Sequence, residues 1–305
     1  MSDLKFRPLQ IEDKDIYEYY YRESDTAFTD LTFTCRMAWN NVFCNQIAVY
    51  EDCCILMSDG GFSTKPHILM PMGKLDSLKL DKILAAVYPE FEKRDWKLQI
   101  MGIDEQKIPI IEGLTNFRGE LFFNEDASDY LYDANALRTL SGNQLHKKRN
   151  HVNKFLRLYA NHRYSSIKCE DKDDCLFLVE EWCKSKNISV DDLKESDYFM
   201  IRKLFDLCGK VDIQGGVIRV GEKVCAFSLG SLGNNNCAFI HFEKADPAIE
   251  GSYSVINQLV LQNEFPDADW VNREEDMGIP GLRKAKQSYF PVKLLRKYKV
   301  YLDIR

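Results

Sequence analysis

Hydrophobic and polar positions in the first half of the chain alternate with the periods of strands and of helices. Strands are predicted at residues 5–9, 46–50, 53–58, 67–70 and 97–101, where apolar runs are bounded by glycine and proline turns. Helices are predicted over 12–21 and 77–93. In the second helix the apolar residues recur at three- and four-residue spacing, which places them on one face: Leu80, Ile83, Leu84, Val87 and Phe91.

The second half of the chain repeats this order of elements. A strand at 165–169 precedes helices at 171–186 and 190–208. An antiparallel meander is predicted at 217–220, 223–232 and 237–244, with glycine-containing turns between its strands. A helix over 253–265 then leads to a strand at 269–273.

Both halves thus contain a strand, one or two helices, a meander, a helix and a final strand. Repetition at a period of roughly 165 residues indicates a duplicated unit. This order resembles that of the GCN5-related N-acetyltransferases, here in tandem. We expect an α+β chain with acetyltransferase-like units at residues 1–133 and 164–305, joined by a basic helical connector at 134–163. Each unit should have a mixed, mainly antiparallel sheet flanked by helices.

The composition predicts a well-packed core and excludes several protein classes. Of 305 residues, 45% are hydrophobic and 12% aromatic, which argues against disorder. No window approaches the roughly 18 consecutive apolar residues of a membrane span, and residues 1–8 lack an apolar signal segment, so we expect a cytoplasmic protein. The ten cysteines contain no Cys-x-x-Cys pair and are expected to be reduced. The five histidines lack partners at metal-ligand spacing, so no metal site is expected.

Positive charge is concentrated in two tracts of an acidic chain. The net charge is −6, which argues against a general nucleic-acid or membrane-surface binder. Residues 134–169 nevertheless contain eight Lys or Arg and no acid, and residues 277–302 contain seven and no acid. The tracts predict a local anion site, although a solvated helix face would have the same composition.

The first basic tract contains a cation on a face that should be buried. Gly142 is expected to end a short helix and Asn143 to cap the next, over 145–159. On a helical wheel Lys148 falls inside the apolar arc and Arg149 at its edge. A buried cation needs an anionic partner. That partner is either a core carboxylate or a bound phosphate, unless the side chain extends its ammonium group to solvent.

A second candidate segment runs from the strand at 237–244 into the following helix. Gly251 and Ser252 are expected to present free backbone N–H groups at the helix start, where an anion or oxyanion could bind. Acetyltransferases have an Arg/Gln-x-x-Gly-x-Gly/Ala pattern here. This chain has one glycine and the acidic Glu250, which disfavours acyl-CoA as a cofactor without excluding it. The alternative is an ordinary capped helix.

The third candidate segment places three carboxylates directly before the second basic tract. Glu274, Glu275 and Asp276 follow the strand at 269–273, and a glycine-framed loop leads to a basic helix. Neighbouring carboxylates raise each other's pKa, which suits one of them to proton transfer or to binding an ammonium group. A merely polar strand end is the alternative.

Two segments, Leu140–Phe155 and Val271–Pro291, resemble signatures of a bacterial family related to the cytosolic C-terminal domain of phosphatidylglycerol lysyltransferases. The resemblance covers nearly the whole chain. It implies a tandem acetyltransferase-like fold, similar also to the Fem peptidyltransferases. Those relatives move an aminoacyl group from a transfer RNA to an amine or hydroxyl. The lysyltransferases carry a large membrane domain that these 305 residues lack, so a small-molecule, peptide or lipid acceptor stays open.

Aminoacyl transfer needs a docking place for the RNA 3′ end, a carboxylate for the amine and donors for the ester oxyanion. Glu274, Glu275 and Asp276 are the candidates for amine recognition or general base, and Tyr289 for proton donor. The candidates for substrate or phosphate binding are Lys148, Arg149, Asn272, Arg273, Arg283, Lys284, Lys286, Gly251 and Ser252.

Two other functions remain open at this point. An acyl-CoA-dependent N-acyltransferase would keep the fold and change the donor. A non-catalytic RNA- or ligand-binding protein would use the basic tracts without the carboxylates.

Overall fold

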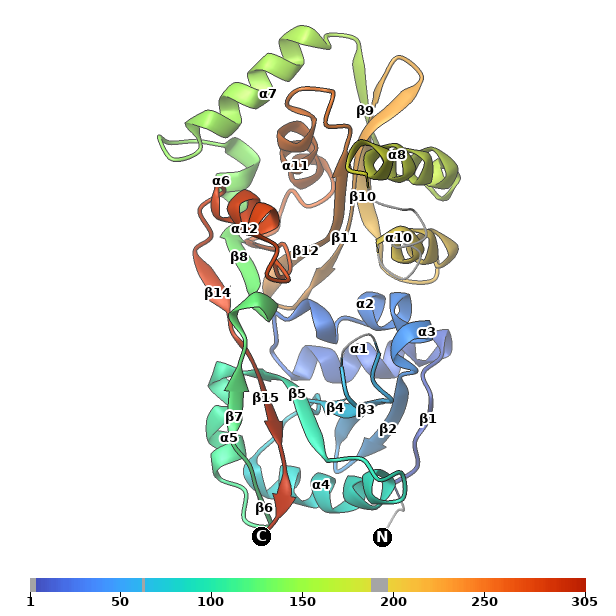
Figure 1. Cartoon of the computed structure of the whole chain (residues 1–305), viewed down its shortest axis with the longest axis vertical. Helices are drawn as coiled ribbons and strands as arrows, with labels where there is room; N and C mark the ends of the chain where they lie inside the picture. Colours follow the sequence, from blue (N-terminus) through green and yellow to red (C-terminus); the bar gives the residue numbers. More distant parts are fainter. Residues whose placement is uncertain (1–3, 62–63, 188–196) are drawn as a thin grey trace. The chain divides into compact units, whose positions relative to one another are not determined.

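The computed structural model describes residues 4–61, 64–187 and 197–305, and the chain forms two compact units. The first contains residues 1–129 together with 295–305, and the second contains residues 130–294 (Figure 1). Within the described ranges no helix combines the length and the hydrophobicity that crossing a bilayer requires.

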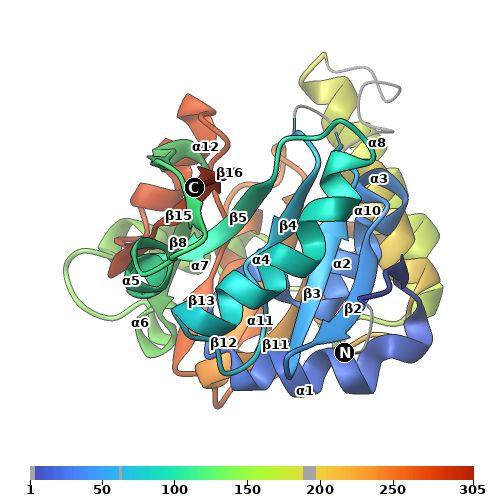
Figure 2. The ribbon, with the colours of Figure 1, turned by 90° about the horizontal axis from the view of Figure 1, so that it is seen from below.

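The first unit is built on a seven-stranded sheet in which one neighbouring pair is parallel. Its order is β1 (Arg7–Pro8), β2 (Gln46–Tyr50), β3 (Cys53–Ser58), β4 (His67–Leu69), β5 (Gln99–Asp104), β15 (Lys297–Tyr301) and β7 (Leu121–Phe123). The parallel pair is β4 and β5, and the connection between them contains α4 (Ser77–Glu92). In Figure 2 α4 lies across one face of the sheet. Its apolar residues belong to the same core as those of β3, β4 and β5.

Shorter elements complete the first unit. The helices α1 (Lys14–Glu23), α2 (Phe33–Ala38) and α3 (Asn40–Phe43) lie between β1 and β2 in the chain, and α5 (Ile108–Glu112) follows β5. A separate two-stranded ribbon pairs β6 (Phe117–Arg118) with β16 (Asp303–Ile304).

The second unit repeats the seven-stranded arrangement. Its order is β14 (Lys293–Leu295), β8 (Asp129–Asp133), β13 (Trp270–Asn272), β12 (Cys237–Ala245), β11 (Lys223–Gly233), β10 (Gln214–Val220) and β9 (His162–Ser166). The parallel pair is β12 and β13, and α11 (Ser252–Asn263) connects them.

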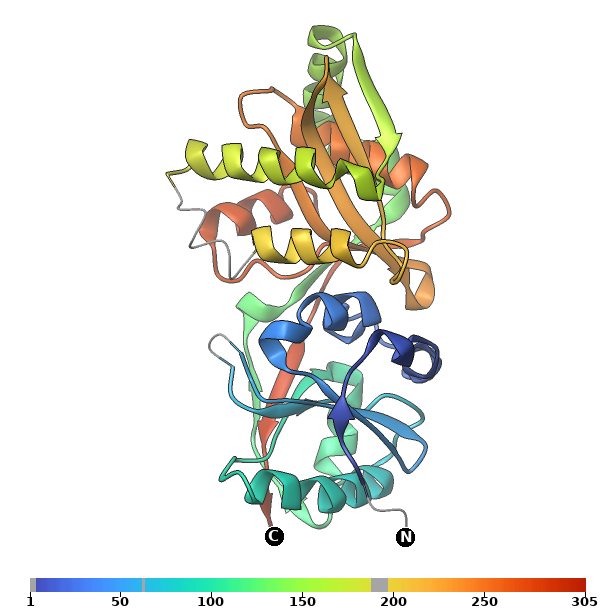
Figure 3. The same ribbon diagram turned by 90° about the vertical axis from the view of Figure 1, so that its right-hand side faces the viewer.

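Helices cover both faces of the second sheet. On one face lie α8 (Lys172–Ser185) and α10 (Asp197–Asp206), which cross β10 and β11 in Figure 3. On the other face α11 packs with α6 (Ala134–Thr139) and α7 (His146–Leu158). The last helix, α12 (Pro280–Gln287), follows β13.

Both units therefore have a mixed, mainly antiparallel sheet flanked by helices, and the α+β fold class predicted from the sequence is confirmed. In each unit an antiparallel meander leads through a helix to a parallel strand. The sixth strand of each sheet, counted from β1 in the first unit and from β9 in the second, pairs antiparallel with that parallel strand. These pairs are β15 with β5 and β8 with β13. Each unit thus takes its sixth strand from a distant part of the chain.

The division observed in the structure differs from the expected boundaries. The segment 134–163, expected as a connector, contributes Leu137, Val152 and Phe155 to the core of the second unit. Residues 295–305 belong to the first unit because β15 pairs with β5 and β7. Strand pairing over so long a stretch of chain has no local signature in the sequence.

Several element ends also differ from the sequence prediction. Leu140, in the left-handed conformation, follows the last residue of α6, and α7 begins with Leu145 at its N-cap position, so Asn143 does not cap it. The expected helix over 190–208 lies partly outside the described residues, and α10 begins at Asp197. The short α2 and α3 were not predicted, because six and four residues give too little periodicity.

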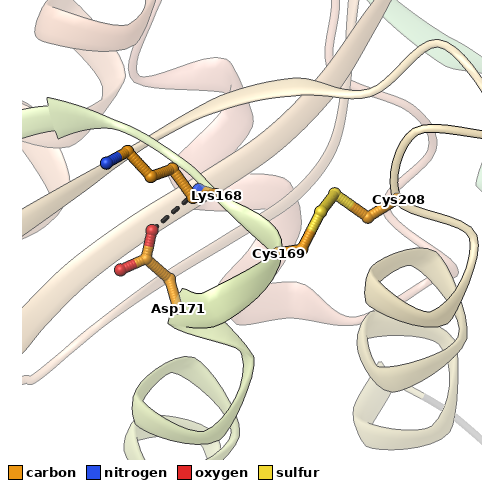
Figure 4. Close-up of a disulfide and its surroundings, with 4 residues drawn as sticks. All are labelled: Lys168, Cys169, Asp171 and Cys208. Atoms are coloured by element: carbon orange, nitrogen blue, oxygen red, sulfur yellow. Dashed lines mark hydrogen bonds between the residues drawn. A yellow bond between two sulfur atoms is a disulfide. The ribbon is translucent and has the colours of Figure 1, made fainter.

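One expectation about the cysteines is wrong. Cys169 and Cys208 form a disulfide, shown in Figure 4, between the turn that precedes α8 and the end of the α10 segment. The backbone N–H of Lys168 donates to Asp171 at 2.7 Å and helps to fix that turn. The two cysteines are 39 residues apart, so nothing in their spacing indicated that they meet. The other eight cysteines are free thiols.

The disulfide predicts a thiol count and a stability change. A thiol titration of the protein unfolded without reductant should find eight thiols, and ten after reduction. Because the bridge closes a 39-residue loop, replacing both cysteines by serine should lower the free energy of unfolding by ~4 kcal/mol, measured in urea. Ten thiols before reduction would contradict the bridge.

Candidate functional site

The candidate site lies in the second unit where the parallel strands β12 and β13 stop pairing. Their ladder covers three residue pairs and ends at Phe239 and Asn272. Asn272 is fully buried, and its side-chain oxygen accepts the backbone N–H of Glu274 at 2.7 Å. Beyond the ladder, polar side chains rather than backbone hydrogen bonds connect the two segments, and we call this region between β12 and β13 the opening.

A buried ion pair on one side of this opening joins Arg273 to Glu243, with 3.0 Å between Nη2 and Oε1. The two side chains are 12% and 10% exposed. The other oxygen of Glu243 accepts a hydrogen bond from Asn257 on α11 at 3.0 Å. The guanidinium also lies over the ring of Tyr289, 4.7 Å from its centroid. Its second terminal nitrogen is buried, and the described part of the chain offers it no hydrogen bond of ordinary geometry.

Lys148 reaches the same group from α7. Its Nζ lies 3.9 Å from the centroid of the Tyr289 ring. Burial, and then the positive charge of Arg273, lower the pKa of Lys148 to about 8, while Glu243 opposes the shift. Lys148 is therefore a partly desolvated ammonium that loses its charge just above neutral pH. The helical-wheel prediction of a cation on the inner face of this helix is consistent with this position.

Tyr289 connects the cations to a cavity. Burial raises the pKa of its hydroxyl, which therefore stays protonated at neutral pH. The cavity beside it has a volume of about 370 Å³. It is lined by the aromatic residues Tyr132, Tyr289 and Phe290 and by residues 141–145, between α6 and α7.

Asp276 has a structural position that the sequence did not reveal. It is 1% exposed and accepts hydrogen bonds from Arg283 Nε at 2.7 Å, Arg283 Nη2 at 2.9 Å, Tyr130 Oη at 2.6 Å and the Gly278 amide at 2.8 Å. The Arg283 guanidinium holds the pKa of Asp276 well below its usual range. The expected roles of Asp276 in proton transfer and of Arg283 in phosphate contact are thus replaced by a mutual ion pair.

Two further predicted phosphate contacts stabilise loops instead. The ammonium of Lys286 is buried and donates to the backbone carbonyls of Arg273 and Glu274. The guanidinium of Arg149 donates to the carbonyls of Leu140 and Gly142, which close the end of α6. Lys284, in contrast, is exposed on α12.

Glu274 extends to the other side of the opening. Its Oε1 lies 3.0 Å from Nδ1 of His241 on β12, and Nε2 of His241 lies 2.9 Å from the hydroxyl of Ser231 on β11. Glu275 is partly buried next to it. Sequence reasoning missed His241 and Ser231. The available signal is the histidine that interrupts an apolar strand.

The expected anion site at the start of α11 is used by the protein itself. The backbone N–H of Ser252 donates to the carbonyl of Ile249 at 3.2 Å, and its hydroxyl donates to the carbonyl of Asp246 at 3.0 Å. Gly251 has φ +86°, and a Cβ there would lie 2.4 Å from the carbonyl oxygen of His151. The glycine therefore permits close contact between α11 and α7.

Two clusters of residues in the second unit offer distinct chemical functions. Lys148 and Arg273 supply positive charge, Tyr289 a protonated hydroxyl and Glu274 a carboxylate. The described residues contain no group of three or more His, Cys, Asp or Glu that could hold a metal ion. This set suits an acyl ester, whose carbonyl oxygen becomes negative on attack by a nucleophile that must lose a proton.

The Asp276 contacts predict a stability effect. Asp276→Asn keeps the size of the side chain but leaves Arg283 without its counter-charge, so the free energy of unfolding should fall by about 3 kcal/mol. Urea unfolding monitored by circular dichroism would measure this, with the exposed Asp267→Asn as a matched control. Equal stability of the two variants would contradict a structural role for Asp276.

Solved structures share this fold over nearly their full length. A conserved protein of unknown function from Bacteroides thetaiotaomicron is 29% identical, with a TM-score of 0.88 over 98% of this chain and 100% of that one. The C-terminal domain of a putative lysylphosphatidylglycerol synthetase from Agrobacterium fabrum is 14% identical, with a TM-score of 0.64 over 96% and 92%. FemX is 7% identical, with a TM-score of 0.68 over 97% and 96%.

A tandem GNAT protein from the clavulanic acid biosynthesis pathway is 8% identical, with a TM-score of 0.50 over 99% of this chain and 98% of that one. Together these neighbours confirm the tandem acetyltransferase-like fold and the resemblance predicted from the sequence. The family model described as phosphatidylglycerol lysyltransferase, C-terminal, matches residues 22–301, which is most of both units. The chain therefore belongs to the family of phosphatidylglycerol lysyltransferase C-terminal domains.

Proposed function

We propose that this protein is an aminoacyltransferase that moves an aminoacyl group from the 3′ end of a transfer RNA to an amine or hydroxyl acceptor. The observation that carries the proposal is the half-buried Lys148 stacked on Tyr289 beside Arg273. Two cations at a buried phenol form a preorganised electrostatic site for an oxygen that becomes negative during reaction. Membership of the family supports the aminoacyl chemistry.

The reaction begins when the acceptor attacks the ester carbonyl carbon, which forms a new C–N or C–O bond and a tetrahedral oxyanion. Lys148 and Arg273 stabilise that negative charge. The carboxylate of Glu274 takes the proton that the nucleophile loses. The ester C–O bond then breaks, and the ribose oxygen that leaves receives a proton from the hydroxyl of Tyr289.

The larger share of basic side chains in the second half of the chain supports an RNA donor. Residues 144–305 carry 26 basic and 23 acidic side chains, whereas residues 1–143 carry 15 and 24. Lys147 on α7 and Lys284 on α12 are exposed and can contact phosphates. The start of α11 gives less support to acyl-CoA, because the Ser252 amide is already bonded and Glu250 pairs with Lys154 at 2.6 Å.

A transfer assay tests the proposal. Transfer RNA charged with each radiolabelled amino acid is incubated with the protein and a panel of acceptors that contains phosphatidylglycerol vesicles, peptides and small amines. Radiolabelled acetyl-CoA serves as the parallel donor. We expect transfer from charged RNA that weakens as salt rises. Transfer from acetyl-CoA alone would indicate an N-acyltransferase, and RNA binding with no transfer from either donor would indicate a binding protein.

The first catalytic prediction concerns the carboxylates. Glu274→Gln keeps the size of the side chain and removes the proton acceptor, so kcat should fall by roughly 10² to 10⁴. The companion variant Glu275→Gln distinguishes the two acids, and we expect the larger loss for Glu274→Gln. Full activity of Glu274→Gln in the transfer assay would remove this residue from the mechanism.

The second prediction concerns pH. Because the pKa of Lys148 is lowered to about 8, the side chain is charged below that pH and neutral above it. Stabilisation of the oxyanion by Lys148 should therefore weaken as the pH rises through 8. Because Lys148→Arg stays charged, the ratio of the wild-type kcat to the Lys148→Arg kcat should fall between pH 7 and pH 9. The same ratio at both pH values would contradict the assignment.

A further inference from the structure

His241 occupies an irregular position in its strand. In the β11–β12 pairing Leu229 faces Phe242 and Gly230 faces Ile240, so His241 is the extra residue of a β-bulge. A bulge changes the direction of a side chain and is common beside active sites. Here it allows the ring to bridge β11 and the loop after β13, with 2.9 Å to Ser231 Oγ and 3.0 Å to Glu274 Oε1.

The hydrogen-bond partners determine the proton positions on a neutral His241. An ionised Glu274 can only accept, so Nδ1 carries the proton that is donated to it. Nε2 is then an acceptor, and the hydroxyl of Ser231 donates to it. The serine thereby fixes both the tautomer and the orientation of the ring.

The three residues become more buried in the order Glu274, His241, Ser231. The side chain of Glu274 is 28% exposed, whereas His241 and Ser231 are 8% and 3% exposed as residues. Glu274 is therefore the member at the surface, and the other two lie behind it. The backbone of Glu274 is also constrained, with φ +59° and its carbonyl accepting the Tyr130 amide at 3.1 Å. A left-handed conformation at a non-glycine residue persists only where its surroundings enforce it.

We infer that His241, oriented by Ser231, is a positioning residue that holds the Glu274 carboxylate ready to accept the proton of the attacking nucleophile. The inference rests on the proposed aminoacyl transfer. The nucleophile's bond to the acyl carbon forms, its proton passes to Glu274, and the C–O bond to the ribose breaks. His241 keeps its own proton throughout, and its contribution is geometric.

Two substitutions at His241 separate positioning from packing. Asparagine can place an amide N–H near the position of Nδ1 and keep the hydrogen bond to Glu274. Glutamine instead places its amide near the position of Nε2 and loses that bond. We expect His241→Gln to lower kcat by about 10², as a misplaced catalytic group does, with KM for charged RNA unchanged. His241→Asn should lose much less, and Ser231→Ala should fall between them.

A spectroscopic measurement provides a readout that does not depend on the reaction. In a long-range ¹H–¹⁵N spectrum of protein labelled with ¹⁵N-histidine, the signal of His241 is the one that disappears in His241→Asn, and it should show the Nδ1–H tautomer. His67 and His162, whose Nδ1 atoms face backbone carbonyls, should give separate Nδ1–H signals that the substitution leaves in place. Ser231→Ala should move the His241 signal toward the Nε2–H form, which solvent-exposed histidine prefers. An Nε2–H tautomer for the His241 signal of the wild-type protein would overturn the inference.

Different results would contradict the positioning role of His241 and the proposed aminoacyl transfer. If the wild-type protein transfers an aminoacyl group and His241→Gln keeps the full kcat, the positioning role is wrong and the proposed function stands. If the wild-type protein transfers nothing from any donor, both are wrong. Should His241→Gln fail to fold, as judged by circular dichroism, Ser231→Ala with an unchanged kcat and KM would overturn the positioning role by itself.

Discussion

The buried charge of Asp276 constrains the loop that carries the candidate site. Four donors from three places in the chain converge on this carboxylate: Tyr130 on β8, the Gly278 amide in the loop and two nitrogens of Arg283 on α12. A carboxylate removed from water is tolerated only with such compensation. These contacts hold the loop that begins at Arg273 and Glu274 in one conformation, and this conformation sets the direction of both side chains.

Consecutive residues of this loop serve opposite sides of the opening between β12 and β13. Arg273 turns to Glu243, which bonds to α11, while Glu274 turns to His241. Both residues follow the end of β13, and Glu274 has a left-handed φ of +59°, so the backbone turns between them. A cation for an oxyanion and a carboxylate for a proton are therefore consecutive in sequence, and each contacts a different residue of β12.

The sequence predicted what depends on local pattern. Periodicity located α4, β2, β3 and the β10–β12 meander, and a helical wheel identified Lys148 as an inward-facing cation. It could not show that Arg283 is used by Asp276, because residue type does not reveal which partner a charge meets in space. It also missed His241 and Ser231, because a bulge changes the register that strand periodicity assumes.

The position of β15 in the sequence, after the whole second unit, imposes an order on synthesis. Residues 130–294 are contiguous, so every strand of the second unit except the end of β14 is present once this stretch has left the ribosome. The first unit needs residues 297–301 to fill the place between β5 and β7 in its sheet. The first unit, although most of it is translated before the second, is therefore the later of the two to complete its fold, and until then the edges of β5 and β7 are unpaired and open to wrong strand partners.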